Sequence, residues 1–312
     1  MERAYRFLRR WQEQSTLSLW VAILMIIANA QKYIRPNNAV TEYVERFKKV
    51  YDCKTLFLTN TGMSAIVDTI EYFRKQYKHV SVEETSYFEV RLLYNGEYEQ
   101  LPDILDGCSD AVYFCDSTIN YDIKALSQRV HENGGILIVD NTSDCIYYNN
   151  PLKDGADVVV ESLTKYVCGH ADMTCGLIAT NLDCERPLSD YVAMRGECVS
   201  EQQGYMAWRG YLTLPVRMER ITKTTQRICR RLDELGVGYK YIGHGGVILL
   251  PDHKKYNMEG LKTFTHCNTF GGVESYWSVT YPYEEPYDFL RLSIGLEPYE
   301  DLIQDVERMI SA

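Results

Sequence analysis

The sequence lacks the cysteine spacings of a metal site or a disulfide framework. It contains no CxxC pair, and its ten cysteines are scattered along the chain at positions 53, 108, 115, 145, 168, 175, 184, 198, 229 and 267. Zinc-binding and disulfide-stapled proteins space their cysteines in recognisable patterns, so the sequence argues against both classes. We expect the cysteines to be reduced thiols in the core of a cytoplasmic protein.

An excess of positive charge is also absent. The chain has 33 lysines and arginines against 43 aspartates and glutamates, for a net charge of -10. Binding to nucleic acid depends on counterion release to basic surfaces, which this composition does not favour. We expect a small-molecule substrate, with no nucleic acid and no membrane as a partner.

No apolar run is long enough to argue for a membrane span. Residues 17–30 are apolar, follow Arg9 and Arg10, and end in Ala28-Asn-Ala30, which imitates a signal-peptidase site. The run is shorter than the roughly 20 residues that a spanning helix needs, and acidic and amide residues dilute the basic region before it. A buried core helix is favoured over a secretion signal.

The composition is that of a globular protein. With 312 residues, 46% of them hydrophobic and 24% charged, the chain can bury a large core and is expected to divide into a large and a smaller domain. No tract is biased enough to indicate disorder.

The most informative stretch is residues 157–172. Val158 to Val160 form a β-branched run typical of a buried parallel strand, and the hydroxyls of Ser162 and Thr164 follow it. Lys165 then lies where the chain leaves the sheet, which is the edge where open α/β sheets bind ligands. A lysine desolvated at this edge becomes a nucleophilic amine, although an ordinary loop lysine stays charged in water.

A second strand supplies an acid. Residues 134–141 read Gly-Gly-Ile-Leu-Ile-Val-Asp-Asn and place Asp140 at a strand end, 25 residues before Lys165. Enzymes that use pyridoxal 5'-phosphate need a carboxylate beside the pyridine nitrogen so that the ring stays protonated. Asp140 and Lys165 have the spacing to serve one ring.

These segments resemble the Cys/Met-metabolism family of pyridoxal phosphate enzymes, the group of cystathionine γ-synthase, γ-lyase and β-lyase. The matching segments are residues 139–142, 155–158 and 162–170. The resemblance implies that Lys165 binds pyridoxal 5'-phosphate as a Schiff base above Asp140. It also implies fold type I, an α/β fold in which a large domain with a mostly parallel seven-stranded sheet precedes a small α+β C-terminal domain.

The resemblance also suggests how the chain divides. Residues 1–40 would form an N-terminal helical segment and inter-subunit arm, residues 41–214 the large cofactor-binding domain, and residues 215–312 a linking helix with the small domain. The stretch from Trp208 to Arg220 is similar to the family segment that opens the linking helix, and Leu235-Gly-Val-Gly238 is a helix stop signal.

Further segments suggest a phosphate site. Asn60 to Met63 join an expected strand, residues 56–59, to a helix from Ser64 onward, and a helix N-terminus attracts anions. By resemblance, Thr61, Gly62 and Met63 would cradle the cofactor phosphate together with Ser162 and Thr164.

Tyr33 and Arg35 resemble family residues that bind this phosphate in the neighbouring subunit. They would make the protein a homodimer at least, with a homotetramer as the other possibility. A surface tyrosine and arginine in a loop is the alternative.

Tyr87 and Asn120 are the remaining residues expected to contact the cofactor. Tyr87 resembles the family tyrosine that stacks on the pyridine ring and assists proton transfer, although two glycines of that motif are replaced by Phe88 and Glu89. A tyrosine that only packs in the core is the alternative. Asn120 resembles the residue that hydrogen-bonds the phenolic oxygen, while Asp116 stands where the family has glutamate.

Arg291 is the expected substrate anchor, because residues 289–297 resemble the family segment whose arginine pairs with the substrate α-carboxylate. Asn268, Thr269 and Phe270 would line the same site. A buried structural arginine on a strand is the alternative for Arg291.

Three functions are compatible with these residues. The first is β- or γ-elimination (C–S lyase) or side-chain replacement on a sulfur amino acid or an activated homoserine, with Lys165 moving the Cα proton. The second is an aminotransferase or racemase of the same fold. A non-catalytic partner protein is the third, and the presence together of Lys165, Asp140 and Arg291 disfavours it.

Overall fold

The computed structural model describes residues 40–83, 86–94, 109–118, 122–279 and 288–311. The apolar run at residues 17–30 and the candidate site residues Tyr33, Arg35 and Asn120 lie outside these ranges. None of the described helices is long and apolar enough to cross a membrane.

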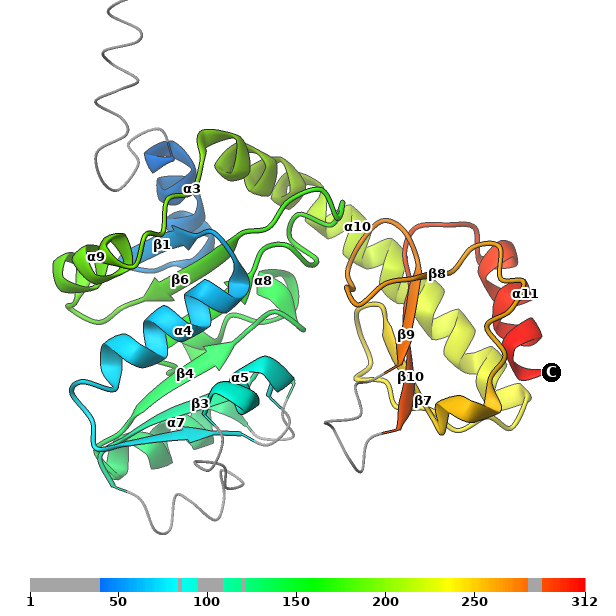
Figure 1. Cartoon of the computed structure of the whole chain (residues 1–312), viewed down its shortest axis with the longest axis horizontal. Helices are drawn as coiled ribbons and strands as arrows, with labels where there is room; N and C mark the ends of the chain where they lie inside the picture. The colour runs from blue at the N-terminus through cyan, green and yellow to red at the C-terminus, as the bar shows by residue number, and fades with distance from the viewer. Residues whose placement is uncertain (1–39, 84–85, 95–108, 119–121, 280–287, 312) are drawn as a thin grey trace, which may run out of the picture.

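The large domain is built on one sheet, which has six strands in the described part of the chain (Figure 1). Its order is β1-β6-β5-β4-β3-β2, and β6 runs antiparallel to both of its neighbours while β2 to β5 pair in parallel. The expected fold class is confirmed, with six strands described where seven were expected. The strands are β1 (Thr55–Thr59), β2 (His79–Val82), β3 (Ala111–Asp116), β4 (Ile136–Asp140), β5 (Val158–Ser162) and β6 (Gly176–Thr180).

Helices cover both faces of this sheet. Alternate strand residues point to opposite faces, so that Val112 and Phe114 pack into one core cluster while Tyr113 and Cys115 pack into the other. The first cluster is covered by α4 (Gly62–Phe73), α5 (Phe88–Leu93) and α9 (Glu185–Met194). The second is covered by α3 (Thr41–Tyr51), α7 (Ile123–Glu132) and the first half of α10 (Glu201–Glu234), beside α8 (Cys145–Tyr148) and a 3-10 turn, η1 (Pro151–Asp154).

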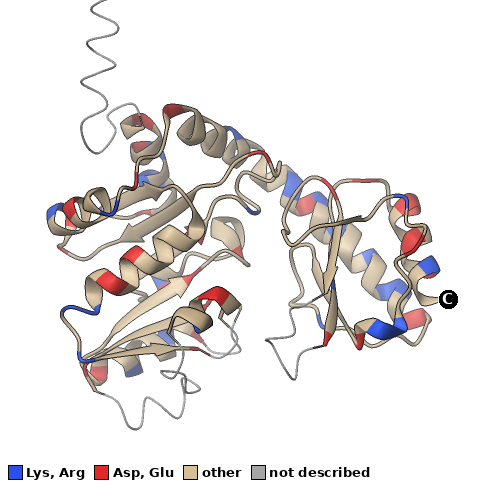
Figure 2. Ribbon diagram, viewed as in Figure 1, with Lys and Arg blue, Asp and Glu red and all other residues tan. Residues whose placement is uncertain are grey.

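The 34-residue helix α10 leads from the large domain into the small one (Figure 1). The prediction that it opens at Trp208 is wrong, because it begins at Glu201. A capping box sets this start: Ser200 Oγ accepts a hydrogen bond from Gln203 N, and the Gln203 side chain accepts one from Ser200 N. Both acidic and basic residues occur along α10 (Figure 2).

The small domain contains a four-stranded sheet of order β7-β10-β9-β8. A third core cluster fills the space between this sheet, the end of α10 and α11. The elements are β7 (Val247–Pro251), a 3-10 turn η2 (His253–Lys255), β8 (Thr265–His266), β9 (Tyr276–Val279), β10 (Phe289–Ser293) and α11 (Tyr299–Ile310). The arrangement matches the expected small α+β domain, and the proposed residue boundaries between domains stay a prediction.

Candidate active site

Lys165 lies in the tight turn that follows β5. The turn is closed by hydrogen bonds from Lys165 N to Ser162 O (3.2 Å) and from Gly169 N to Lys165 O (2.7 Å). The side chain is partly buried, and its Nζ lies 5.7 Å from the centre of the Phe270 ring. A lysine of the large domain therefore faces a loop of the small domain.

The surroundings of Lys165 favour a neutral amine. Burial lowers the pKa of Lys165, the cation of Arg291 lowers it further, and Asp140 is the strongest group that opposes them. Cys267 and Glu89 also lie close enough to oppose the shift. Sequence reasoning had placed Lys165, Asp140 and Arg291 in one site, and the structure brings the three side chains within electrostatic range of one another.

Asp140 ends β4 and is buried between β3 and β5. Its Oδ1 accepts hydrogen bonds from Thr142 N (3.0 Å) and Thr142 Oγ1 (2.5 Å). Burial raises the pKa of Asp140, while the two Thr142 donors and the Lys165 charge oppose that rise. The donors thus stabilise a carboxylate that burial alone would neutralise.

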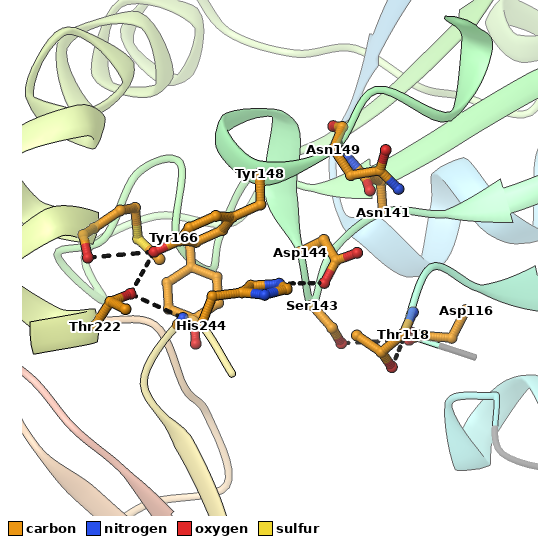
Figure 3. A network of polar contacts seen from close by, with 12 residues as sticks. Asp116, Thr118, Asn141, Ser143, Asp144, Tyr148, Asn149, Tyr166, Thr222 and His244 are labelled. Carbon is orange, nitrogen blue, oxygen red and sulfur yellow. Dashed lines mark hydrogen bonds and ion pairs between the residues drawn. The ribbon is translucent and has the colours of Figure 1, made fainter. Parts of the chain in front are cut away.

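Asp116 is a second acid beside Asp140, and its role was missed in the sequence. The two residues are direct partners in the parallel β3–β4 register. Thr118 N and Thr118 Oγ1 donate to Asp116 Oδ1 (2.9 and 2.8 Å), and Ser143 Oγ donates to its Oδ2 (3.3 Å; Figure 3).

Burial and then the Asp140 charge raise the pKa of Asp116 to about 7. Two neighbouring buried carboxylates cannot both ionise cheaply, so the charge of each disfavours ionisation of the other. Each acid ends a strand, but only the observed register shows that the two are partners.

The N-terminus of α4 meets the end of β5 at close range. Thr61 caps the helix by accepting a hydrogen bond from Ser64 N (2.9 Å), and a Cβ on Gly62 would lie 2.4 Å from Ser162 Cβ. Helix N-terminal N–H groups and the Ser162 hydroxyl therefore converge, as an anion site requires. Met63 follows in the first turn. The Thr164 hydroxyl is engaged elsewhere, donating to Cys175 O (3.3 Å) and accepting from Cys175 N (3.1 Å).

Arg291 reaches the site from β10. Its Nη2 donates to Thr269 O (3.3 Å), and its Cζ lies 5.8 Å from the centre of the Phe270 ring. Lys165 and Arg291 thus both lie near the Phe270 ring, beside Asn268 and Thr269. The alternative of a buried structural arginine does not fit well, because Arg291 is only partly buried.

Tyr87 precedes α5 as its N-cap, is 45% exposed, and its ring centre lies 5.0 Å from that of Phe88. A core-packing tyrosine would be buried, so the alternative reading of Tyr87 does not hold. Its contact with the cofactor stays a prediction.

A polar network that sequence reasoning missed joins the two domains (Figure 3). His244 Nε2 and Asp144 Oδ1 are 2.8 Å apart, and the ring of Tyr148 lies 4.3 Å from that of His244. The Tyr148 hydroxyl contacts Thr222 Oγ1, which accepts a hydrogen bond from Gly245 N (3.0 Å). The loop at residues 243–246 is thereby tied to the large domain beside Lys165.

Comparison with known proteins finds one matching family. Residues 116–259 match the model of the family described as Cys/Met metabolism PLP-dependent enzyme. Over these residues the chain is similar to this family. The region matched contains Asp140, Ser162 and Lys165.

Relatives of the chain carry related names. It is 32% identical over 226 residues to a cystathionine gamma-lyase of Dictyostelium discoideum, covering 61% of this chain and 58% of that protein. It is 27% identical over 341 residues to an L-methionine gamma-lyase of Fusobacterium nucleatum subsp. polymorphum. This match covers 88% of this chain and 85% of that protein. The chain thus matches less than two thirds of the first relative's length.

Solved structures share the fold. MetB from Corynebacterium glutamicum superposes with a TM-score of 0.79 at 24% identity, covering 88% of this chain and 85% of that one. A cystathionine gamma-lyase from Lactobacillus plantarum superposes with a TM-score of 0.78 at 19% identity, covering 87% and 86%.

The site residues of this chain fit pyridoxal phosphate. The helix N-terminus at Gly62 leaves no room for a Cβ against Ser162, which suits close approach of backbone N–H groups to a phosphate. The donor set supplies an amine of lowered pKa at Lys165 and a buried carboxylate at Asp140.

Proposed function

We propose that the protein catalyses pyridoxal phosphate-dependent β- or γ-elimination, or side-chain replacement, on a sulfur amino acid or an activated homoserine. One observation carries the proposal: the amine of Lys165 lies within electrostatic range of both the Asp140 carboxylate and the Arg291 cation. The names of its relatives, cystathionine gamma-lyase and L-methionine gamma-lyase, support C–S chemistry.

The chain's own residues divide the work of binding the cofactor. Lys165 Nζ would hold it covalently, Asp140 would face its pyridine nitrogen, and Tyr87 would cover the ring. Thr61, Gly62, Met63, Ser162 and Thr164 would surround its phosphate. Pyridoxal phosphate, when bound, acts as an electron sink that makes the Cα proton of an amino acid acidic.

Two side chains would act on the substrate directly. The guanidinium of Arg291 would pair with the α-carboxylate and so fix which Cα bond faces Lys165. The substrate amine would take the place of Lys165 on the cofactor, which frees the Lys165 amine. Lys165 would then accept the Cα proton and return it, because the lowered pKa of its amine keeps a larger fraction neutral near neutral pH. Phe270, whose ring centre lies 5.7 Å from Lys165 Nζ and 5.8 Å from Arg291 Cζ, would limit the space for the substrate side chain.

The substrate assay tests this function. The purified protein is incubated with cystathionine, cysteine, homocysteine, methionine and an O-acylhomoserine in turn, and keto acid, ammonia and sulfide are measured. Elimination releases keto acid and ammonia together with the leaving group, which is a thiol or sulfide from the sulfur amino acids and a carboxylic acid from the O-acylhomoserine. A keto acid formed in an amount equal to the enzyme, with the cofactor left in its amine form, would support an aminotransferase instead.

We further propose that the protein works in the cytoplasm as a homodimer at least. Tyr33 and Arg35 would complete the phosphate site of the neighbouring subunit, and Asn120 would contact the cofactor's phenolic oxygen. Size-exclusion chromatography with light scattering tests the assembly. A monomer with full activity would overturn the shared site.

A further inference from the structure

A buried arginine lies directly behind the Lys165 turn. Arg217, in the middle of α10, is 4% exposed. Its Nη1 donates to Tyr166 O (2.7 Å), its Nη2 to Val167 O (2.9 Å) and Gly210 O (2.9 Å), and its Nε to Thr213 Oγ1 (3.0 Å). All four donor contacts go to neutral oxygens, two of them in the peptide units that follow Lys165.

Keeping this guanidinium buried costs free energy. No carboxylate pairs with Arg217 among the residues that the structure describes, and burial lowers its pKa. Its flat fork can bind two successive carbonyls at fixed positions, which a lysine ammonium cannot do. The cost of burying this charge suggests that Arg217 does more than fill space. Its contacts fix the position of the backbone that follows Lys165.

The backbone of the Lys165 turn packs closely against Arg217 and α10. Gly169, which ends the turn at a φ of +70°, would place a Cβ 2.1 Å from Arg217 Nη1. Gly210, about two turns before Arg217 on α10, would place a Cβ 2.6 Å from Cys168 Cα. The turn from Lys165 to Gly169 therefore lies directly on α10 with Arg217 beneath it.

The opposite side of the turn is held by Tyr166. Its hydroxyl accepts a hydrogen bond from Gly246 N (2.9 Å), and its ring lies edge-on to Phe270 with centres 5.5 Å apart. Tyr166, the residue after Lys165, is thus held on two sides. Its carbonyl contacts Arg217 of α10, and its side chain contacts the small-domain loops that contain Gly246 and Phe270.

We propose that Arg217 is a positioning residue that holds Lys165 at the place where Asp140 and Arg291 both act on its amine. The inference rests on the proposed function of Lys165. Without the two carbonyl contacts the turn can shift and admit water. Lys165 then loses part of the desolvation that makes its amine reactive.

The test measures the reactivity of Lys165 itself. The full-length protein, freed of cofactor, is acetylated with trace acetic anhydride across a range of pH, and each lysine is quantified by peptide mass spectrometry. Arg217→Met removes all four donor contacts, Arg217→Lys keeps the charge without the fork, and Arg220→Met is the control on the exposed face of the same helix. Exposed Lys153 serves as the internal reference.

We expect the acetylation midpoint of Lys165 to rise in Arg217→Met, toward the ordinary lysine value. Arg217→Lys should give an intermediate midpoint, and Arg220→Met should match the wild type. Lys153 should be unchanged throughout. An unshifted Lys165 midpoint in Arg217→Met would overturn the proposal.

If Arg217→Met does not fold, Arg217→Lys and Thr213→Val decide the question, and unshifted midpoints in both overturn it. This measurement needs neither cofactor nor substrate. A protein that shows the shift but processes no sulfur amino acid would refute the proposed function and leave the role of Arg217 intact.

Discussion

Lys165 illustrates how a residue acquires its chemistry from its neighbours. Alone, its amine would be protonated at neutral pH, but burial and Arg291 lower its pKa against the opposing charge of Asp140. The strand-Asp and strand-Ser-x-Thr-Lys patterns identified Lys165 and Asp140 from the sequence. The pairing of Asp116 with Asp140 depends on strand register, so it was visible only in the structure.

Arg291→Lys tests the substrate anchor. Lysine keeps the positive charge but loses the bidentate geometry, so we expect kcat/KM to fall by about 10- to 100-fold, mainly through a higher KM. Steady-state kinetics on the best substrate from the assay panel give the value. The visible absorbance of the bound cofactor should be unchanged, and an unchanged KM would contradict the anchoring role.

Glu161→Gln tests a buried acid that lies outside the proposed chemistry. Burial raises the pKa of Glu161 from its ordinary 4.5 to about 8, and Tyr51 donates a 2.6 Å hydrogen bond to its Oε2. The folded state then holds a proton that the unfolded state releases. The stability from this proton is complete below about pH 4.5 and is lost as the pH rises through about 8.

The glutamine variant lacks this titration. The free energy of unfolding is measured in urea for both proteins. As the pH rises from about 5 to about 8, the value for the wild type should fall relative to the value for the variant. Parallel pH profiles for the two proteins would show that Glu161 is ionised in the folded state.

Among the secondary-structure elements, local patterns predicted the large domain better than the small one. Apolar strands and capped helices such as α7 follow short-range rules, and the strand expected at residues 56–59 is observed as β1, Thr55–Thr59. The start of α10 was missed although its capping box, Ser200 with Gln203, is readable in the sequence. The small-domain sheet has short strands whose pairing is set by distant residues, and no local pattern indicates it.

Gly62→Ala tests the contact between α4 and β5. The added Cβ would lie 2.4 Å from Ser162 Cβ and would force the helix N-terminus away from the strand. We expect a loss of about 1–3 kcal/mol in the free energy of unfolding, and weaker binding of pyridoxal phosphate followed by absorbance.

Gly238→Ala is the matched control for this change, since a Cβ there meets nothing within 4 Å. Equal stability losses in the two variants would show that α4 and β5 are not in tight contact.

At the scale of the whole molecule, two domains share the proposed site. Lys165 and Asp140 come from the large domain and Arg291 from the small one, so the relative position of the domains sets the chemistry. The network of Asp144, Tyr148 and Thr222 with the loop at residues 243–246 fixes that position. No sequence motif predicts this network, because its residues come into contact only when both domains have folded.

Asp144→Asn tests this network. The substitution weakens the contact with His244, so the amides of Gly245 and Gly246 should exchange hydrogen faster, by about fivefold for a loss near 1 kcal/mol. Hydrogen exchange followed by mass spectrometry gives the rates. The control is Asp252→Asn, which removes a surface pair with Lys255 elsewhere in the small domain. Equal exchange in both variants would contradict the role of the network.

The central claim is that one amine, that of Lys165, holds the cofactor. Pyridoxal phosphate is added to the full-length protein, the complex is reduced with borohydride, and the pyridoxyl group is located by peptide mass spectrometry. The account predicts a single modified position, Lys165, and none in Lys165→Ala. Label spread evenly over surface lysines such as Lys153, and retained in Lys165→Ala, would contradict it.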